Sequence, residues 1–255
     1  MAEPKLDIWK FFDVTHQFHS VLNPISNTKI DELIELLNLK SQAAVLDIAC
    51  GKGEILTRIA ERYTISGVGV DISPFFVADA KQKLKQRVPN SRIEILNMDG
   101  ADYKPDRQFD LSMCIGASWI YKGHRETLRA LKSMTKPSGL ILVGEPFWLK
   151  EPEDAYLTAA GETIDDFGTH YENVLAGTEE DLLLLYTLVS NQDDWDRYTA
   201  LRWYSTARFV EENKDDPDVT EIVKRVGHEK ATYLQWGRDT VGWAIYLFEN
   251  PDTNL

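Results

Sequence analysis

Short apolar runs alternate with helical patterns between residues 43 and 143, and this alternation limits the possible folds more than any other feature. Five runs have the length of buried strands, and the segments between them space apolar residues as on one face of a helix. Strands that alternate with helices in this way form an open, mostly parallel sheet covered on both faces. The predicted strands are residues 43–48, 65–70, 92–96, 109–115 and 140–143, the last preceded by a turn at 137–139.

Glycine or polar residues follow each of these five runs. Parallel strands present their carboxyl ends at one edge of the sheet, and such sheets bind ligands outside that edge. The agreement among separate strand ends carries more weight than any single motif, and it predicts a binding crevice there. The residues concerned are Gly51 and Gly53, Asp71, Asp99, Gly116 with Ser118, and Glu145.

The turn after the first run contains two glycines one residue apart, Gly51 and Gly53, directly before a predicted helix at 54–63. Glycine permits backbone angles and close approaches that a Cβ atom would forbid, so a ligand can lie against the main chain at the helix start. A dinucleotide-binding fingerprint requires a third Gly or Ala three positions after Gly53, and that position is Leu56. A nicotinamide dinucleotide site is therefore disfavoured.

The pattern changes after residue 148. Residues 150–180 are acidic and rich in loops, 182–190 resembles a sixth strand, 193–237 is largely helical, and 240–248 is a final strand. Because that strand follows a long helical excursion, we expect it to be antiparallel to the others. With no repeat or linker we expect one α/β domain over 1–255: an N-terminal helical lid (1–27), a cofactor-binding core (28–145), a substrate-side elaboration (146–239), and the last strand and tail (240–255).

Composition narrows the classes of partner. No apolar run approaches the 18 residues of a membrane span, and the N-terminus is too mixed in charge for a signal peptide. The formal net charge of −13 disfavours nucleic acid, and the two cysteines belong to no metal-binding pattern. We expect a cytoplasmic monomer or homodimer that binds no metal, no nucleic acid and no membrane.

The stretch Val45–Gly53 resembles the first motif of class I S-adenosylmethionine-dependent methyltransferases, in which an apolar strand ends in acid-x-x-Cys/Gly-Gly-x-Gly. The resemblance continues through 69–73, 97–101, 109–110 and 131–143, and it covers about residues 28–145. It is most specific to small stand-alone bacterial enzymes of the ubiquinone-biosynthesis-like group (methyltransferase types 11 and 25). The shared features are His16-x-x-His19, Gly-Ala-Ser-Trp at 116–119, Gly-Glu-Pro-Phe-Trp at 144–148, and Trp-Asp-Arg-Tyr at 195–198.

The resemblance implies a seven-stranded Rossmann-like sheet and a cofactor site at the strand ends. Asp47 would orient the glycine loop or bind the cofactor's ammonium, Asp71 would accept both ribose hydroxyls, and Asp99 would accept from the adenine amine. The alternatives are an ordinary glycine turn, a helix cap and a turn aspartate. The implied cofactor-binding set is Asp47, Ala49, Cys50, Gly51, Gly53, Asp71, Ile72, Ser73, Asp99, Gly100, Ala101, Cys114, Gly116 and His19.

The same resemblance places the methyl acceptor beyond strands four and five. Glu145 would accept a donor from the substrate or neutralise a cationic one, and His16 would be a base or a hydrogen-bond partner. Packing and capping are the ordinary roles of such residues, and they stay open for each position. The candidates for substrate contact are Trp119, Trp148, Tyr171 and Tyr204.

The implied reaction is transfer of a methyl group from S-adenosylmethionine to a small-molecule acceptor by in-line displacement, releasing S-adenosylhomocysteine. A sulfonium methyl is already activated, so the reaction needs alignment and exclusion of water more than a demanding acid–base pair. Two alternatives stay open: a nicotinamide dinucleotide-dependent oxidoreductase, and a catalytically silent methyltransferase-fold binding protein.

Overall fold

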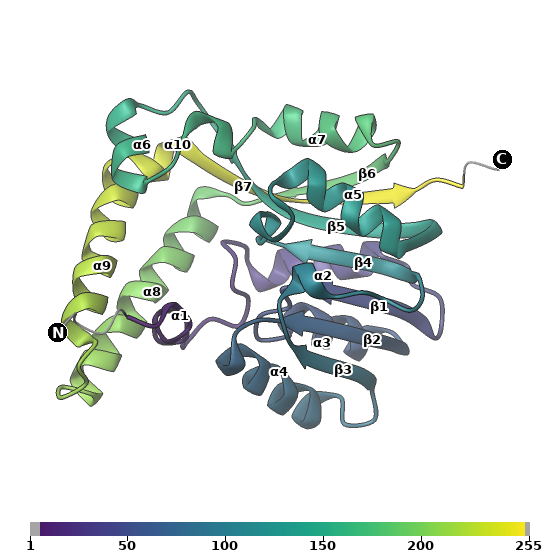
Figure 1. The fold of residues 1–255 in the computed structure, drawn as a ribbon, viewed down its shortest axis with the longest axis horizontal. Coiled ribbons are helices and arrows are strands. Elements are labelled where there is room, and N and C mark those ends of the chain that lie inside the picture. The colour runs from purple at the N-terminus through teal and green to yellow at the C-terminus, as the bar shows by residue number, and fades with distance from the viewer. Residues whose placement is uncertain (1–5, 253–255) are drawn as a thin grey trace.

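The computed structural model describes residues 6–252, so residues 1–5 of the predicted lid and 253–255 of the predicted tail lie outside the described residues. Seven strands form one sheet in the order β3-β2-β1-β4-β5-β7-β6 (Figure 1). The strands are β1 (Ala43–Ile48), β2 (Ile65–Asp71), β3 (Arg92–Asn97), β4 (Phe109–Ile115), β5 (Thr135–Trp148), β6 (Leu183–Val189) and β7 (Val241–Asn250).

Among these strands, β7 alone runs in the opposite direction to the other six. The pairs β3–β2, β2–β1, β1–β4 and β4–β5 are parallel, whereas β7 is antiparallel to both β5 and β6. This confirms the predicted mostly parallel sheet with an antiparallel last strand. The order reverses at β1, between β2 and β4, which is where such sheets bind ligands.

The fifth strand begins earlier than the sequence predicts. Residues 137–139, predicted as a turn, lie within β5, and the register of β4 against β5 shifts between Phe109 and Leu111. Ser138 has a positive φ of 56°. Phe109 pairs with Thr135 whereas Leu111 pairs with Leu140, so β5 holds extra residues between these two pairs and the chain turns locally at Pro-Ser-Gly. The predicted turn is present, and the difference from the prediction is that the strand already begins before it.

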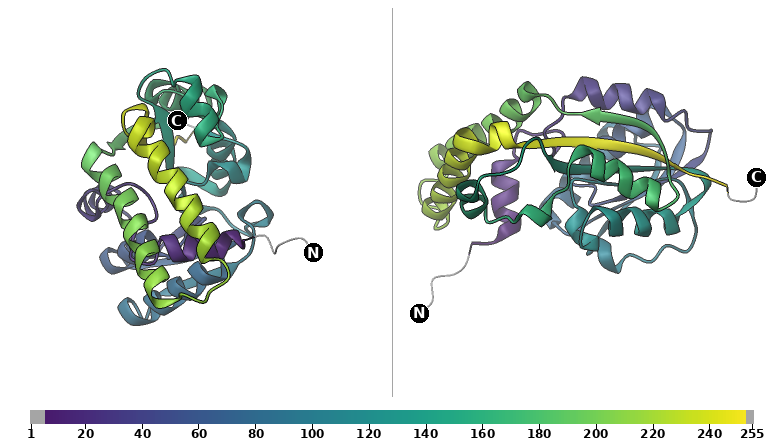
Figure 2. Two further views of the ribbon diagram at one scale, coloured as in Figure 1. Left: turned by 90° about the vertical axis from the view of Figure 1, so that its left-hand side faces the viewer. Right: turned by 90° about the horizontal axis from the view of Figure 1, so that it is seen from above.

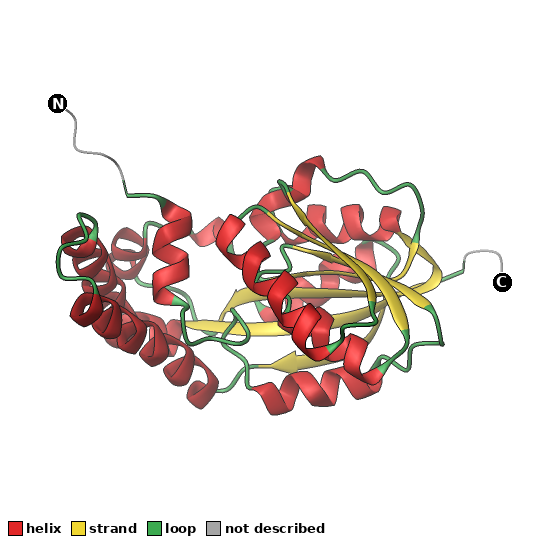
Figure 3. Ribbon diagram, turned by 90° about the horizontal axis from the view of Figure 1, so that it is seen from below, coloured by secondary structure: helices red, strands yellow, loops and turns green. Residues whose placement is uncertain are grey.

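Helices cover both faces of the sheet (Figure 3). Residues of α2, α3 and α4 form one apolar core with the sheet, and residues of α5 and α7 form a second core on the opposite face. In β1, Val45 belongs to the first core and its neighbour Leu46 to the second, which explains why the strand is apolar at nearly every position. These helices are α2 (Asn27–Leu36), α3 (Glu54–Arg62), α4 (Pro74–Arg87), α5 (His124–Met134) and α7 (His170–Glu179).

A group of helices lies across the carboxyl ends of the parallel strands (Figure 2). It comprises α1 (Ile8–Thr15), α6 (Asp154–Ala160), α8 (Gln192–Glu212) and α9 (Val219–Thr232), and a π-helical turn at Tyr233–Gly237 leads back to β7. The side chains of Phe11, Val14, Ile222 and Val226 join α1 to α9 in a separate apolar cluster. The N-terminal segment and the second half of the chain thus form a common roof over the edge where a ligand is expected.

None of the helices within residues 6–252 has both the length and the apolar character needed to cross a bilayer.

The packing of α7 on the sheet gives a stability prediction. A Cβ atom at Gly177 would lie 2.2 Å from Cε1 of Phe248, whereas a Cβ at Gly227 in α9 would meet nothing within 4 Å. We expect Gly177→Ala to lower the free energy of unfolding by about 1–3 kcal/mol through overpacking. We expect Gly227→Ala to raise it by up to about 1 kcal/mol, because glycine weakens a helix interior. Urea denaturation of the two variants measures both effects, and equal shifts would contradict the packing.

Candidate functional site

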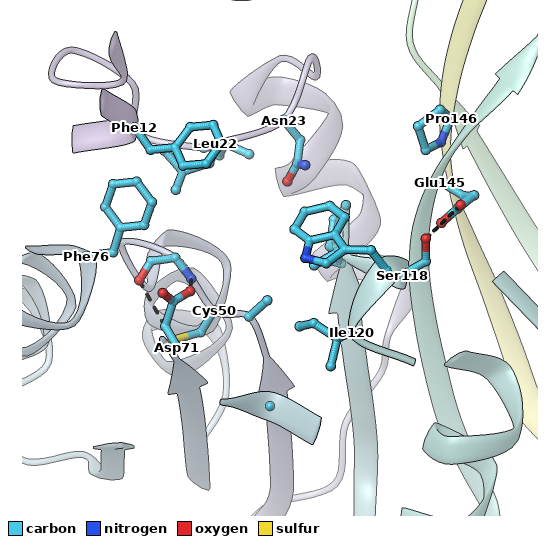
Figure 4. A pocket seen from close by; sticks show the side chains of 18 of the residues that line it. Phe12, Leu22, Asn23, Cys50, Asp71, Phe76, Ser118, Ile120, Glu145 and Pro146 are labelled. Carbon is cyan, nitrogen blue, oxygen red and sulfur yellow. Dashed lines mark hydrogen bonds between the residues drawn. The ribbon is translucent and has the colours of Figure 1, made fainter. Parts of the chain in front are cut away.

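A cavity of about 980 Å³ lies at the carboxyl ends of β1, β2, β4 and β5, beneath α1 and the lid loop, which we define as residues 16–25. Its walls come from the central strand ends, the lid loop, and residues of the second half of the chain. Figure 4 shows Asp71 and Cys50 on one side of the cavity, and Ser118 and Glu145 on the opposite side. The predicted crevice therefore has two separate polar ends.

Asp71 is the last residue of β2 and its carboxylate is held in place by main-chain donors. Oδ2 accepts a hydrogen bond from the Gly51 amide at 2.8 Å, and Oδ1 accepts one from the Ser73 amide at 2.8 Å. Burial raises the pKa of Asp71, and these two hydrogen bonds oppose that shift. A carboxylate has further lone pairs beyond these two. Asp71 thus presents an oriented acceptor to the cavity it lines.

Asp47, in β1, lines the same end of the cavity and is only 4% exposed. Its carboxylate makes no hydrogen bond with any residue in the described part of the chain. Burial, with a smaller contribution from Asp71, raises its pKa well above the ordinary value. A buried carboxylate without a donor is costly unless a ligand supplies one, so this position fits a cationic group.

The loop after β3 lines the cavity next to Asp71. The Asp99 carboxylate caps a short 3-10 helix, Gly100–Asp102, by accepting a hydrogen bond from the Ala101 amide at 2.9 Å. Asp99 is exposed toward the cavity, and the half-exposed Ile72 and Ile120 lie on its walls. A carboxylate beside two apolar side chains suits a flat ring that carries an amine. Ala49 and Cys50 also line this end.

Gly51 and Gly116 allow the lid loop to lie close against the strand ends. Both have positive φ, 53° and 76°. A Cβ atom on Gly51 would lie 2.7 Å from Cδ1 of Leu22, and one on Gly116 would lie 2.1 Å from Nδ2 of Asn23. Gly53 has a different neighbour, since its Cβ would lie 2.9 Å from that of Ala80 in α4, and it is not part of the cavity wall. The position of Gly53 therefore accounts for close packing of α3 against α4 and does not support the predicted ligand contact.

Lys52, between the two glycines, fastens the lid loop. Its buried ammonium donates to the carbonyl oxygens of His16 at 3.1 Å and Gln17 at 3.4 Å, and it lies 3.2 Å from the Asp79 carboxylate. The glycine motif gives no hint of this role, because the carbonyls come from a distant segment.

Replacing this lysine should loosen the lid loop. In Lys52→Met we expect hydrogen exchange across residues 16–25 to rise about tenfold or more, because hydrogen bonds from charged groups contribute about 1.5–3 kcal/mol. Mass spectrometry of the exchanged peptides measures the change. Lys81→Met, at an exposed position of α4, is the matched control, and equal exchange in the two variants would contradict the role of Lys52.

His16 and His19 both form hydrogen bonds that join the lid loop to α8. His16 donates from Nδ1 to the Phe12 carbonyl at 3.0 Å, and its Nε2 accepts from the Tyr198 hydroxyl at 2.9 Å. Burial lowers its pKa well below the usual value. His19 donates from Nε2 to the Tyr198 carbonyl at 2.9 Å, and burial lowers its pKa to about 4. His16 lines the cavity with both nitrogens occupied, and His19 does not line it, although its Nδ1 is buried without a hydrogen-bond partner among the described residues. The positions of these two histidines do not support the predicted base and cofactor contact.

Glu145, in β5, is 4% exposed and lines the cavity. Its Oε1 accepts from the Ser118 hydroxyl at 2.8 Å, while its Oε2 is buried without a hydrogen-bond partner. Nδ1 of His124 lies 3.9 Å from Oε2, too far for a hydrogen bond, and burial lowers the pKa of His124 to about 4, so that histidine is neutral at pH 7. Burial raises the pKa of Glu145 to about 7, against the Ser118 hydrogen bond. This carboxyl can gain or lose a proton near neutrality.

The raised pKa of Glu145 predicts a pH-dependent effect on stability. Between the unfolded pKa near 4.5 and the folded value of about 7, the native state retains a proton that the unfolded state has lost. Wild type therefore loses stability relative to Glu145→Gln as pH rises through this window, by about 3 kcal/mol in all, at about 1.4 kcal/mol per pKa unit. Urea denaturation of both proteins at pH 4.5 and pH 8 measures the difference. A difference that does not change with pH would contradict the assignment.

The four aromatic residues predicted to contact the acceptor fall into two groups. Trp119 lines the cavity and is 72% exposed, so it is free to meet a ligand. Trp148 is buried, donates to the Ile164 carbonyl at 2.9 Å and packs within an aromatic cluster away from the cavity wall. Tyr171 and Tyr204 are exposed outside the cavity wall. The substrate contacts predicted for Trp148, Tyr171 and Tyr204 are therefore not supported by their positions.

Two predicted cofactor residues lie behind the cavity wall. Cys114 is fully buried in the sheet, where burial raises the pKa of its thiol, and Ser73 caps α4 by accepting from the Phe76 amide at 3.3 Å. Neither lines the cavity. Other wall residues could not be predicted from the sequence because no local motif marks them: Phe12, Leu22, Asn23, Phe76 and Lys122. Trp195 also lines the cavity, and it is the first residue of the Trp-Asp-Arg-Tyr motif, to which no site role was assigned.

Known proteins resemble this chain in sequence and in structure. The family model described as a methyltransferase domain matches residues 45–139. The chain is 31% identical to an S-adenosylmethionine-dependent methyltransferase from Thiobacillus denitrificans, with coverage of 95% of this chain and 99% of that one and a TM-score of 0.88. This chain belongs to the S-adenosylmethionine-dependent methyltransferases. The methyltransferase is accordingly an enzyme whose cofactor is S-adenosylmethionine.

Two further relatives span nearly the same length as this methyltransferase. An S-adenosylmethionine-dependent methyltransferase from Geobacter sulfurreducens is 30% identical over 96% of this chain and 99% of that one, with a TM-score of 0.89. The uncharacterised protein YjhP of Escherichia coli is 29% identical over 94% of this chain and 98% of its own length. The Thiobacillus and Geobacter proteins were crystallised in complex with S-adenosylhomocysteine.

Proposed function

We propose that this methyltransferase transfers the methyl group of S-adenosylmethionine to a small-molecule acceptor by in-line displacement. The donor binds at the Asp71 end of the cavity and the acceptor at the Glu145 end. The observation that carries the proposal is one continuous cavity of about 980 Å³ with polar groups at both ends. Small-molecule sites span about 300–1,000 Å³, so a cavity at the upper limit has room for two ligands.

The residues at the donor end match the functional groups of the cofactor. Asp71 accepts the two ribose hydroxyls with the lone pairs that its two main-chain donors leave free. Asp47 pairs with the cofactor's ammonium group, and Asp99 accepts from the adenine amine. The Thiobacillus and Geobacter relatives were crystallised in complex with S-adenosylhomocysteine, which supports binding of this cofactor by the chain.

The protein's contribution to the reaction is alignment and exclusion of water. The bound cofactor supplies a methyl group activated by its positively charged sulfur. The lid loop, held by Lys52 and lying against Gly51 and Gly116, closes the cavity over both ligands. Glu145 faces the acceptor, where its second oxygen can receive a hydrogen bond or a proton.

Calorimetry tests the donor side of this proposal. Titration with S-adenosylmethionine, S-adenosylhomocysteine and NAD should give saturable binding of the first two and none of the third. Leu56 at the third fingerprint position already argues against a dinucleotide. Binding of NAD alone, or of none of the three, would overturn the proposed function.

A further inference from the structure

We propose that the acceptor is an amine that enters the cavity as a cation and is held by Glu145 and the aromatic side chains around it. The inference rests on the proposed function, because it names the acceptor class of the same site. The charge, an unpartnered carboxylate oxygen and the exposed aromatic surface at that end of the cavity support it.

Carboxylates outnumber basic groups at the acceptor end. This part of the wall contains four acidic side chains, Glu145, Glu162, Asp165 and Asp166. Among the described residues, the basic side chain that lines the same part is Lys122. Lys122 is exposed. Lys52 also lines the cavity, but its ammonium is engaged by lid carbonyls and Asp79. A cationic ligand is therefore favoured over an anionic one.

The acidic side chains differ in what they offer a ligand. Glu162 accepts a hydrogen bond from the Tyr156 hydroxyl at 3.2 Å, and Asp166 accepts one from the Thr163 amide at 2.6 Å. Glu145 is more than nine-tenths buried, and its Oε2 has no partner. A buried oxygen without a donor costs free energy that an ammonium N–H would recover. Asp165 is exposed, so water competes with a ligand for its carboxylate. Of these acids, Glu145 is therefore the buried one with an oxygen left for a cation.

Aromatic faces surround the same space. Trp119 follows β4 with 72% of its surface exposed, and Phe167, Trp195 and Tyr198 also line the cavity. An indole exposed at a cavity wall loses no packing when a ligand covers it. Aromatic faces attract cations, with tryptophan the strongest of the three ring types. The combination of one buried carboxylate with several rings selects an amine over a neutral alcohol.

The chemistry balances with Glu145 as the proton acceptor. The protonated amine first transfers its proton to the Glu145 carboxylate, which leaves a neutral amine with a free lone pair. The lone pair forms the new nitrogen–carbon bond to the methyl group, while the electrons of the carbon–sulfur bond remain on sulfur. The products are a methylated ammonium and a neutral thioether. The pKa of Glu145, raised by burial to about 7, suits this proton transfer at neutral pH.

The proposal predicts that amine binding strengthens with pH between 6 and 8, as Glu145 ionises. The groups that face Glu145 are the Ser118 hydroxyl, neutral His124, the Cys114 thiol and the Tyr246 phenol. Burial raises the pKa of the thiol and the phenol and lowers that of His124 to about 4. None of these neighbours changes charge between pH 6 and 8. Burial also raises the pKa values of Asp47 and Glu162 on the cavity wall, so the comparison with Glu145→Gln is what assigns the change in binding to Glu145.

The test uses three probes of similar shape on protein saturated with S-adenosylhomocysteine: benzylamine, benzyl alcohol and benzoate. Calorimetry at pH 8 should show benzylamine binding at least about tenfold more tightly than the other two, and at least about threefold more tightly than at pH 6. In Glu145→Gln the preference and its pH dependence should disappear. Glu126→Gln, an exposed position of α5 paired with Arg129, should behave as wild type.

The outcomes separate the two proposals. If wild type fails to bind S-adenosylhomocysteine, the proposed function is overturned and the amine inference falls with it. If S-adenosylhomocysteine binds but benzylamine shows no advantage over benzyl alcohol or benzoate, only the amine class is overturned. If the preference persists in Glu145→Gln, the assignment to Glu145 is overturned. Thermal denaturation of this variant verifies that it is folded.

Discussion

Asp71→Ala is expected to lower the affinity for S-adenosylmethionine by at least about 100-fold. The carboxylate is fixed by the Gly51 and Ser73 amides and presents its remaining lone pairs to the ribose hydroxyls. Hydrogen bonds to a charged group contribute about 1.5–3 kcal/mol each, and each factor of ten in affinity corresponds to about 1.4 kcal/mol. Calorimetric titration with S-adenosylhomocysteine, which shares the ribose, measures the loss.

A second aspartate provides the matched control for Asp71. Asp110 accepts a hydrogen bond from the Ala44 amide at 2.7 Å and pairs with Lys136, but it lies at the start of β4 and outside the cavity wall. Asp110→Ala should therefore lower stability without changing affinity. An unchanged affinity in Asp71→Ala, or equal losses in both variants, would show that Asp71 is only a structural carboxylate of the same kind.

Gly116→Ala is expected to weaken cofactor binding by about tenfold through the lid loop. The new methyl group would lie 2.1 Å from Nδ2 of Asn23, so the lid loop must move away from the end of β4. Because a displaced lid no longer closes the donor end, affinity for S-adenosylhomocysteine should fall. Hydrogen exchange across residues 16–25 should rise at the same time.

Gly161→Ala is the control that separates displacement of the lid loop from the backbone strain of an alanine at positive φ. It has a similar positive φ of 72°, but a Cβ atom there would meet nothing within 4 Å, and it lies outside the cavity wall. Gly161→Ala should therefore carry the same strain of about 1–2 kcal/mol with no change in affinity. The role of the lid would be contradicted if Gly116→Ala and Gly161→Ala bound S-adenosylhomocysteine equally well.

The sheet and its polar strand ends could be predicted from the sequence because they depend on neighbouring residues. A buried parallel strand is apolar at nearly every position, as β1 is, and the residues near or just after its carboxyl end must lie at the ligand-binding edge. Asp47, Asp71, Asp99 and Glu145 all lie on the cavity wall for this reason. The position of a side chain at a strand end follows from the strand itself, so it can be predicted without knowing which distant segments pack nearby.

The remaining wall residues could not be predicted, because they depend on contacts between distant parts of the chain. Leu22 and Asn23 reach the cavity only because the lid loop lies against two glycines of the sheet. Trp148 is the last residue of β5, yet its indole packs in an aromatic cluster, where it donates to the Ile164 carbonyl. His16 carries a family-like motif, but Tyr198 of α8 occupies its Nε2. In these cases the direction of the side chain depends on packing against α8 and other segments above the strand ends. Such contacts between distant segments leave no local pattern in the sequence.

The most direct test of the account is methyl transfer from labelled S-adenosylmethionine into a small-molecule cell extract, read by mass spectrometry. Wild type should produce a labelled acceptor together with S-adenosylhomocysteine. Asp71→Ala should give neither product at cofactor concentrations that saturate wild type. If wild type binds the cofactor under the same conditions and no fraction of the extract acquires the label, the protein is a binding protein and the account of a two-ended catalytic cavity is wrong.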